Sequence, residues 1–540
     1  GEEKADFQFI QTFDDWFAKI RDKYLSYTKY FVDSWKLTLS VLGIIVLFTA
    51  GMFLIIPRGF LPLEDRGAVF TQIQLPDGSS ASRTDEVAKD VEKKLTQIPG
   101  VKETISLVGL NGENTAFIVS DFKPWSKRHK KEESLDGIMK NINQQFAHYP
   151  SATVATFSPP AISGLGMFGG FEYQLLDKGD RDASELYSQA KKLMGTVMQD
   201  PNFEMFYTTY SANLPQLELD VDVDKAMAQS VQVSEVYNAI ASYFAKTYVN
   251  DFNKYGRVYR VYVQADSPYR ARISDINKIY VKNTLGNMVP LSSVIKIKNV
   301  VGPYTRTRFN MYPAVTFNGS TRAGISSGKA MEMMEKISDE VLPEDMGFAW
   351  SGSSLQEKQS SGQIIPILIM SLVFIFLFLV GLYESWLLPI SVLLVTPVAL
   401  VGALLFQYVS GYSLDIYSQI GLVMLIGLST KQAILIIEFA KDAHEGGLSI
   451  RDAAMQAAKL RFRAVMMTNI AFILGLLPLV FASGAGAASR HSVGMTVFGG
   501  MIAVAFVGTL LVPAFYVMVE EFKLNFAKRV KQYRESKKNA

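Results

Sequence analysis

The chain has 540 residues, of which 49% are hydrophobic and 19% are charged, and its formal net charge is +3. So small a charge gives no reason to expect a nucleic-acid partner, and the lack of cysteine excludes disulfides and thiolate metal sites. The mean hydropathy of +0.15 is high for a soluble protein and low for an all-membrane one, which predicts a mixed architecture.

Residues 1–36 are polar, aromatic and partly basic, and they do not have the form of a signal peptide. Because the first residue is Gly, we expect that it is not the natural start. The uncharged run Leu37–Ile56 then has the length of about 20 residues that a membrane span requires. Five more apolar runs predict five further spans between 364 and 519: Ile364–Leu382, Leu387–Val409, Ile416–Phe439, Ala464–Ala482 and Val493–Val519.

Basic residues near the span ends indicate the orientation, because such residues stay on the cytoplasmic side. Residues 1–36, the connection Lys441–Arg463 and the basic tail 520–540 each carry several Lys and Arg side chains. We therefore expect both termini in the cytoplasm and the long segment 57–363 outside it.

The outer segment has alternating strand and helix patterns. The predicted elements are a strand at Ala68–Gln74, a helix at Ser82–Ile98, strands near Thr104–Val108 and Ala116–Asp121, a helix at Leu135–Phe146 and a strand at Ala152–Phe157. This β-α-β-β-α-β order is that of the split βαβ, or ferredoxin-like, arrangement.

A second copy of this order is predicted to begin at Phe171–Leu176. Its next elements are a helix at Ala183–Gln199 and strands near Phe203–Tyr210 and Gln216–Val223, and its closing elements are Ala314–Asn318, Ser327–Ile337 and Phe348–Ser351. The strand-rich stretch between them, with strands at Tyr259–Val263 and Lys278–Val281, is interpreted as an inserted subdomain.

Several short motifs carry no chemistry. Gly164, Gly166 and Gly169 fit a dinucleotide fingerprint, but Pro159-Pro160 stands where the motif needs a strand, so we interpret this segment as a flexible apolar loop. Residues 323–330 depart from a phosphate-binding loop at both ends, and the four histidines do not have zinc spacing. No convergent nucleophile, base or metal set is present, so we predict no enzyme activity, no bound metal and no cofactor.

Lys431 lies inside the predicted span Ile416–Phe439, about 15 Å from its cytoplasmic end. An unpaired lysine at that depth costs at least about 2.5–3.5 kcal/mol, and ionisable residues inside a membrane mark ion or proton pathways. Thr468, seven residues after Arg461 in the next span, is expected at a comparable depth. No acid lies mid-membrane in this chain, since Asp415 and Glu438 are near span ends, so the partner of Lys431 is expected outside this sequence.

The segment Gly427–Asp442 resembles the tenth-span motif of transporters of the resistance-nodulation-division (RND) family, in their hydrophobe/amphiphile exporter class. Further similarities are at Arg461–Thr468, Tyr383–Trp386, Tyr248–Phe252 and Pro57–Pro62. The resemblance covers essentially the whole chain but only the C-terminal half of the family protein. It implies that paired aspartates, which the family carries in its fourth span, belong to an N-terminal half that is not in this sequence.

The resemblance also implies a domain plan. The fold class is an α-helical membrane bundle of six spans with an α+β extracytoplasmic domain. That domain would hold one ferredoxin-like porter subdomain at 57–160 and a second formed by 161–223 and 310–355. The insertion, 224–309, would be a docking subdomain that faces an outer-membrane channel.

By the same resemblance, the chain is half of a proton-driven efflux transporter in the bacterial inner membrane, with its large domain in the periplasm. The proton relay would consist of Lys431, Arg461 and Thr468, and the proton gradient would be the energy source. The implied partners are the N-terminal half with its aspartates, two further copies in a rotating homotrimer, a periplasmic adaptor protein, the outer-membrane channel, membrane lipids and small amphiphilic substrates taken from the periplasm or outer leaflet.

The loop Pro159–Phe171 offers an apolar lining for a drug site, since aromatic and methionine side chains suit promiscuous binding. The candidate residues are Pro160, Met167, Phe168 and Phe171, although the same side chains would equally serve to pack the subdomain. The loop Gly109–Asn114 is short and lacks the phenylalanines that many drug exporters have there, which leaves the substrate range open. Gln432 stands where asparagine is commoner.

Two alternatives remain open from the sequence. The same architecture could export metal ions or lipids, although no methionines or acids converge between the porter subdomains. The second alternative is a non-transporting membrane scaffold or translocation helper. A scaffold, however, has no reason to bury the charge of Lys431.

Overall fold

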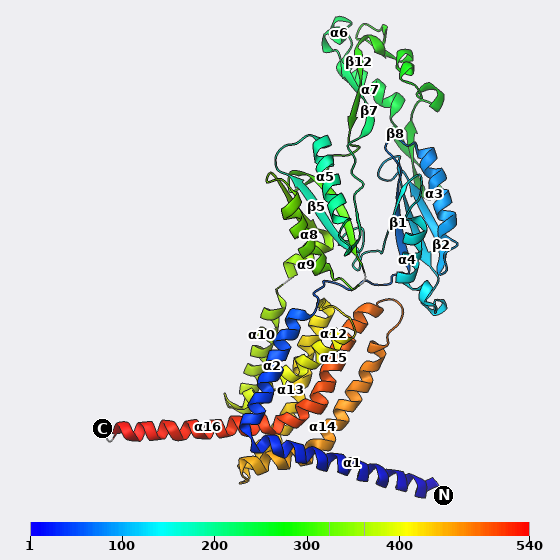
Figure 1. Cartoon of the computed structure of the whole chain (residues 1–540). Coiled ribbons are helices and arrows are strands. Elements are labelled where there is room, and N and C mark those ends of the chain that lie inside the picture. Colours follow the sequence, from blue (N-terminus) through cyan, green and yellow to red (C-terminus); the bar gives the residue numbers. More distant parts are fainter. Residues whose placement is uncertain (1, 323, 361, 539–540) are drawn as a thin grey trace. The chain divides into compact units, whose positions relative to one another are not determined.

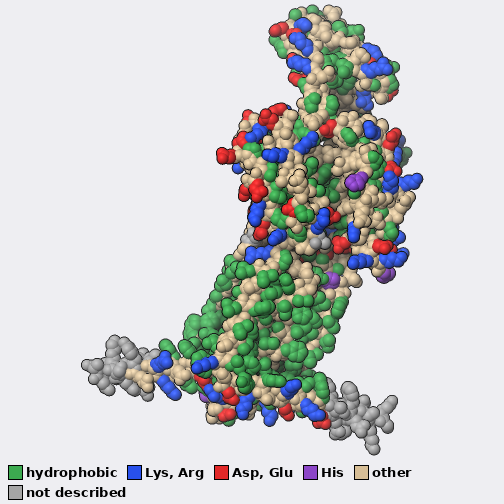
Figure 2. All heavy atoms as spheres, viewed as in Figure 1, with side chains coloured by type: hydrophobic (Ala, Val, Ile, Leu, Met, Phe, Trp, Pro, Cys, Tyr) green, Lys and Arg blue, Asp and Glu red, His purple; other side chains and the backbone are tan. Residues whose placement is uncertain are grey.

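The computed structural model describes residues 2–322, 324–360 and 362–538, with side chains from residue 15 onward except at 527, 530, 531 and 533–538. In this part of the chain, six helical segments are long and apolar enough to cross a membrane, which confirms the six predicted spans. They are α2 (Trp35–Ile55), α10 (Ile364–Tyr383), α11 with α12 (Leu388–Leu393 and Thr396–Val409), α13 (Ile416–Glu445), α14 (Ile450–Val480), and α15 with α16 (Ala487–Ala503 and Thr509–Lys538). Figure 2 shows hydrophobic side chains covering these helices.

Several helices continue beyond the apolar runs that predicted them. α13 extends to Glu445, and α14 already begins at Ile450, where the Ser449 side chain caps it by accepting a hydrogen bond from the Asp452 amide. Residues 2–33 form helix α1, whose Tyr24 ring stacks on Phe462 of α14 at 4.5 Å. Helical backbone satisfies its own hydrogen bonds, so a helix need not end where its sequence becomes polar.

Small residues bring α12, α13 and α15 close together in the bundle. A Cβ added to Gly499 would lie 2.4 Å from the Cβ of Phe406, and one added to Gly402 would lie 2.6 Å from the Gly499 carbonyl oxygen. Close backbone approach through small residues is the usual way in which membrane helices associate. After α15 the last span contains one π-helical turn, η6 (Val504–Gly508), before α16 begins.

The first α+β region contains β1 (Ala68–Gln74), α3 (Ala81–Leu95), β2 (Val101–Val108), β3 (Thr115–Phe122), α4 (Leu135–Phe146) and β4 (Thr153–Phe157). The strands form one antiparallel sheet in the order β2-β3-β1-β4. Helices α3 and α4 lie beside this sheet (Figure 1). Alternate β1 residues such as Val69 and Ile73 are fully buried against apolar residues of both helices, which include Val91 and Ile138. The order of strands and helices in this region is therefore the one that the sequence predicted.

The second α+β region has the same element order. It contains β5 (Phe171–Asp177), α5 (Ala183–Val197), β6 (Phe203–Tyr207), β14 (Tyr312–Thr321), α8 (Ser327–Val341) and β15 (Met346–Ser351), followed by α9 (Gly352–Ser360). The strands of this sheet pair in the order β15-β5-β14-β6. The two-residue strand β13 (Arg308–Phe309) also pairs with β14. Its aromatic core includes Phe206 and Phe317, whose rings stack at 4.5 Å.

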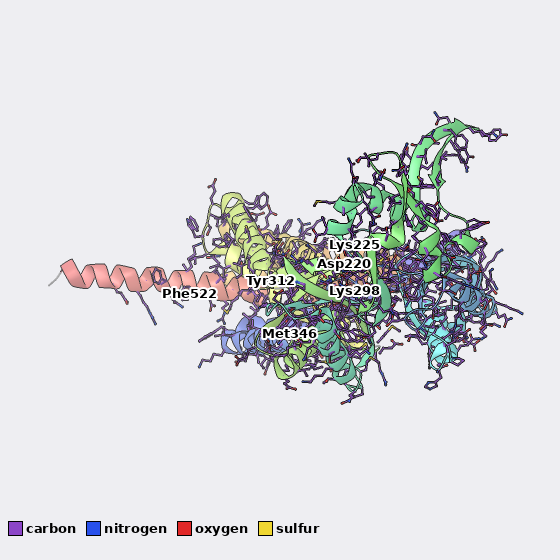
Figure 3. The ribbon with its side chains drawn as sticks, turned by 90° about the horizontal axis from the view of Figure 1, so that it is seen from above. Asp220, Lys225, Lys298, Tyr312, Met346 and Phe522 are labelled. Carbon is purple, nitrogen blue, oxygen red and sulfur yellow. The ribbon has the colours of Figure 1, made fainter. Side chains whose placement is uncertain are left out.

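The insertion is larger than the sequence predicted. Residues 210–306, with 182–187, form a separate compact unit, whereas the prediction began the insertion at 224 and ended it at 309. The segment predicted as strand Gln216–Val223 of the second copy is β7 (Leu214–Val221), which pairs with β12 (Ile295–Gly302) of the insertion. Lys298 and Asp220 form an ion pair of 3.2 Å across this ladder (Figure 3).

The other elements of the insertion are short. They are α6 (Val223–Ala228), α7 (Val233–Phe244), the hairpin β8 (Thr247–Lys254) and β9 (Arg257–Val263), and the pair β10 (Tyr280–Lys282) and β11 (Met288–Pro290). The described residues also form the 3₁₀ turns η1 (Trp125–Lys127), η2 (Lys131–Glu133), η3 (Ser267–Tyr269), η4 (Ile273–Lys278) and η5 (Leu291–Ser293).

Candidate functional site

Lys431 lies on a face of α13 that the other described residues leave uncovered. Its neighbours on that face, Ile420, Met424 and Gly427, are also exposed, and a Cβ added to Gly427 would meet no atom within 4 Å. Among the residues described, no hydrogen bond or ion pair involves the Lys431 ammonium. A cation on an apolar helical face is stable in a bilayer only if another polar group covers it.

The three predicted relay residues are arranged by the packing of α13 against α14. The guanidinium of Arg461 lies over the Phe439 ring, 3.3 Å from its centroid, which places these two residues at one level. Lys431 is eight residues before Phe439 and Thr468 seven residues after Arg461, or about 12 and 10.5 Å along the antiparallel helices. Lys431 and Thr468 are therefore at nearly the same depth, and Arg461 lies one to two turns away.

The hydroxyl groups near Lys431 are bonded to their own helices. Thr468 donates to the carbonyl oxygen of Val465 at 2.9 Å, Thr430 to that of Gly427 at 2.9 Å, and Ser429 to that of Ile426 at 3.0 Å. These bonds join none of the three relay residues to another. The structure therefore brings Lys431 and Thr468 to one level but does not bring them, or Arg461, into direct contact.

The carboxylates of the bundle lie away from this level. Asp415 begins α13 and accepts hydrogen bonds from the Ser418 amide at 2.7 Å and the Ser492 hydroxyl at 2.6 Å. Glu438 is exposed next to Phe439, about two turns from Lys431. Neither acid lies at the depth of Lys431.

Two buried amides lie next to the relay residues. From the sequence, Gln432 was noted only as a departure from the commoner asparagine, and Asn469 was missed. Asn469, which follows Thr468, is 0% exposed, and neither end of its amide has a partner in the described part of the chain. Gln432, which follows Lys431, is also buried with its side-chain oxygen unpaired. Buried amides are normally satisfied, by water if not by protein, so these positions favour bound water inside the bundle. Their polarity within an apolar span was the available signal.

The loop between the two sheets divides the four predicted substrate residues. Met167 is 53% exposed, whereas Phe171 is buried in the second sheet, where its ring packs against Phe203 and Trp350. Phe168 lies between the regions, with its ring 4.6 Å from Phe157. Pro160 is half-buried, and its carbonyl oxygen accepts a hydrogen bond from Arg66 at 3.1 Å. Phe171 therefore packs the subdomain core, and Met167 is the most accessible of the four side chains.

A surface hollow of about 490 Å³ lies elsewhere, between the end of α3 and the middle of α4. Its lining includes Lys94, Gln97, Asn141 and Gln145, none of which belongs to the loop 159–171. This mostly polar lining lacks the aromatic and methionine side chains expected of a site for apolar compounds.

The sequence model of the AcrB/AcrD/AcrF family matches residues 1–520 of the chain. The toluene efflux pump membrane transporter TtgB of Pseudomonas putida is 38% identical over 487 residues, which are 89% of this chain and 46% of that protein. The multidrug resistance protein MdtF of Escherichia coli (strain K12) is 37% identical over 527 residues, 95% of this chain and 51% of that protein.

The multidrug export protein AcrF of the same Escherichia coli strain is 36% identical over 487 residues, which are 88% of this chain and 47% of that protein. The chain therefore spans about half the length of the curated relatives that it matches.

Proposed function

The chain belongs to the AcrB/AcrD/AcrF family of RND multidrug efflux transporters, and on that premise we propose that it is the C-terminal half of a proton-driven drug exporter. The observation that carries this proposal is the uncovered, unpaired Lys431 in the middle of α13. A structural scaffold gains nothing from such a charge, whereas a proton relay requires one whose partner can change its protonation state.

The relay needs a carboxylate that lies outside this sequence, in the N-terminal half. When that carboxylate is ionised, it pairs with Lys431, and when a proton neutralises it, the pair is released. Thr468 lies at the same depth and can hydrogen-bond to the acid, and Arg461, one to two turns nearer the cytoplasm, lies on the route by which the proton leaves. Each change of protonation would alter how the N-terminal half packs on the face of α13, which drives movement of the helices.

The outer domain would move the substrate. Two regions with the strand order of ferredoxin-like units suit the role of porter subdomains. The apolar loop between their sheets, with Pro160, Met167 and Phe168, is the proposed contact surface for amphiphilic or hydrophobic compounds from the periplasm or outer leaflet. The proton gradient is the proposed energy source, and no cofactor is required.

The assembly proposed for this half follows from the family. It includes the N-terminal half, a homotrimer, a periplasmic adaptor and an outer-membrane channel, with the insertion as the docking surface. The exposed hairpin β8–β9 supports this role, because a two-stranded ribbon with exposed aromatic side chains such as Tyr248, Phe252 and Tyr259 is hardly stable without a partner. The proposed location is the bacterial inner membrane, with the α+β regions in the periplasm.

Drug accumulation in bacteria without their own pumps tests this function. The chain is produced alone, with a matching N-terminal half, and with that half and the substitution Lys431→Met. We expect export only from the unmodified pair. Lys441→Met is the matched control, because Lys441 lies in the same helix but is paired with Glu445 at 3.8 Å near the cytoplasmic end. Export that survives Lys431→Met would disprove the relay role.

A further inference from the structure

Three consecutive charged residues between α2 and β1 each bind a different part of the molecule. Glu64 contacts the start of helix α15, Asp65 contacts the first α+β region, and Arg66 contacts the loop between the two sheets. We call residues 57–67 the coupling segment. Three adjacent side chains can bind three separate parts only where those parts meet.

Glu64 serves as the N-terminal cap of α15. Its carboxylate accepts hydrogen bonds from the amides of Ser489 at 2.7 Å and Ala488 at 3.3 Å. The residue before the helix is Gly486, which has no side chain to do this. Free amides and the helix dipole at this end favour a carboxylate. The last span is therefore attached at its outer end to the coupling segment.

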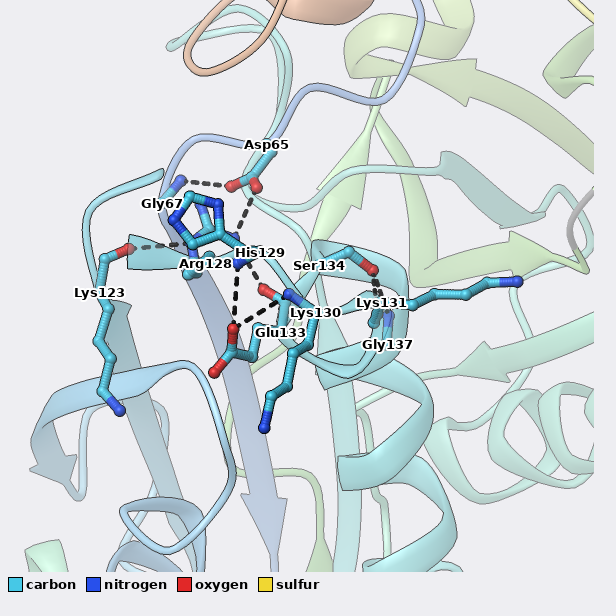
Figure 4. Close-up of polar contacts among 10 residues, drawn as sticks. All are labelled: Asp65, Gly67, Lys123, Arg128, His129, Lys130, Lys131, Glu133, Ser134 and Gly137. Carbon is cyan, nitrogen blue, oxygen red and sulfur yellow. Dashed lines mark hydrogen bonds and ion pairs between the residues drawn. The ribbon is translucent and has the colours of Figure 1, made fainter. Parts of the chain in front are cut away.

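Asp65 attaches the segment to the first α+β region (Figure 4). Its carboxylate pairs at 2.8 Å with Arg128, whose side chain is only 3% exposed and also donates to the carbonyl oxygens of Lys123 and Glu133. The second oxygen of Asp65 accepts a hydrogen bond from the Gly67 amide at 2.9 Å. Removal of one partner from so buried a pair is costly, so this attachment is firm.

Arg66 attaches the segment to the proposed substrate loop. Its guanidinium donates to the Pro160 carbonyl oxygen and to the Ser163 hydroxyl, both at 3.1 Å. Pro160 and Ser163 belong to the same loop as the exposed Met167. Arg66 itself is exposed, so its main contribution is to hold the loop rather than to fill a core.

The start of the coupling segment is attached to helix α13, which carries Lys431. The Leu414 amide donates to the Pro57 carbonyl oxygen at 2.8 Å, and the Ile416 amide donates to that of Phe60 at 3.1 Å. A Cβ added to Gly328 of α8 would lie 3.0 Å from the Arg58 carbonyl oxygen, so the second α+β region is in close contact as well. There is little room for the segment to slide independently of these elements.

We propose that the coupling segment transmits movements of α13 and α15 to the substrate loop, with Glu64 and Arg66 as positioning residues for transport. This inference rests on the proposed function, because it assumes that protonation at Lys431 moves these helices. A shift of α13 displaces residues 57–60, and a shift of α15 displaces Glu64. Since Arg66 follows two residues later, the loop with Pro160 moves with them.

The test uses liposomes that contain both halves of the transporter, an imposed pH gradient and a fluorescent amphiphilic dye as the substrate. Substrate movement and proton flux are measured in the same vesicles. For Arg66→Ala we expect proton flux close to that of the unmodified protein, with at least about fivefold less dye moved per proton, the size of effect typical of a lost coupling contact. Arg66→Lys, which keeps one donor group, should restore much of that ratio.

Two further variants separate coupling from stability. Arg83→Ala removes an exposed arginine from α3 and should leave the ratio unchanged. Glu64→Gln keeps an acceptor for the Ser489 amide and should couple better than Glu64→Ala. Equal losses of dye movement and proton flux in Arg66→Ala would mean that Arg66 only supports the fold, and no loss of either would mean that its contact is idle; both results overturn the proposal.

Failure of the proposed function itself would show in the unmodified protein, as dye movement that does not depend on the pH gradient or on Lys431. That result would overturn the coupling role too, because no proton-driven helix movement would remain to be transmitted.

Discussion

At the residue scale, the position of Lys431 balances a cost against a function. A lysine at this depth costs a few kcal/mol in a bilayer unless an acid covers it. The side chain lies on a face that the described part of the chain leaves open, so under the proposed function the free energy of the site depends on a group outside this sequence. The same dependence makes the site sensitive to the protonation of its partner.

Glu357 of α9 is a second unusual ionisable group, outside the spans and only 8% exposed. Its carboxylate accepts a hydrogen bond from Ser327 at 2.9 Å, but burial raises its pKa from 4.5 to about 7. The folded protein therefore holds a proton that the unfolded chain has released between pH 4.5 and 7. Stability from this group is complete below pH 4.5 and is lost as the pH rises through 7, by roughly 3 kcal/mol.

We expect Glu357→Gln to remove this pH dependence. Its melting temperature should equal that of the unmodified protein near pH 5 and exceed it at pH 8, because a neutral amide has no proton to lose. Thermal unfolding of the purified protein across this pH range measures the difference. Glu340→Gln in the neighbouring helix α8, where the side chain is exposed, is the control. Parallel melting curves for Glu357→Gln and the unmodified protein would contradict the raised pKa.

The sequence alone could assign a role to some residues but not to others. Lys431 was recognisable because a charge inside a 20-residue apolar run has few harmless explanations. Met167 and Phe171 could not be told apart, because whether an apolar side chain lines a surface or fills a core depends on partners distant in sequence. Trp350, one partner of Phe171, is far along the chain. The contacts of Glu64 and Arg66 were hidden for the same reason.

At the element scale, local patterns predicted the six spans, the helices that cover the two sheets and most strands, but not α1, α6, α7 or α9, nor the pairing of β7. Membrane spans are set by the length of an apolar run, which the sequence states directly. The sequence predicted β7 correctly as a strand but assigned it to the wrong sheet. Its partner β12 begins at Ile295, 74 residues after β7 ends at Val221, so the pairing could not be seen locally. Periodicity specifies which face of a strand is buried but not which strand lies beside it.

The contact between α12 and α15 is the element-scale feature most sensitive to substitution. We expect Gly499→Ala to lower the melting temperature, because the new methyl group would lie 2.4 Å from Phe406 and 2.7 Å from the Gly402 carbonyl oxygen. Overpacking of this kind typically costs about 1–3 kcal/mol, which exceeds the gain in helix propensity of about 1 kcal/mol.

Gly43→Ala in α2 is the matched control, since its added Cβ would meet no atom within 4 Å. It should be neutral or slightly stabilising in the same detergent melting experiment. An equal melting temperature for both variants would show that α12 and α15 are not so closely packed.

At the scale of the whole molecule, α13 and α14 expose apolar side chains that the described part of the chain leaves uncovered. The exposed apolar face of α13 with Lys431, together with exposed α14 residues such as Met467 and Leu474, is what a second set of helices would cover. We expect Gly427→Leu to reduce co-purification of a tagged N-terminal half, because a large side chain on this face prevents close helix approach.

The isolated chain should melt at an unchanged temperature, since nothing in the described part of this chain lies within 4 Å of the added Cβ. Gly195→Leu on the exposed side of α5 is an equally open substitution and should not affect co-purification. Undiminished recovery of the N-terminal half with Gly427→Leu would place the interface on another face.

The π-helical turn η6 has a consequence for the phase of the last span. In an α-helix each residue advances the side-chain direction by about 100°, and a π turn accommodates roughly one residue more than a regular turn. If the same residues formed a uniform α-helix, the extra residue of the π turn would rotate everything after it by about a quarter of a turn. The side chains of Val512, Phe515 and Tyr516, now buried, would then face a different direction. The π turn thus changes the direction in which the later side chains point, so that residues before and after it can each pack against their own neighbouring helices.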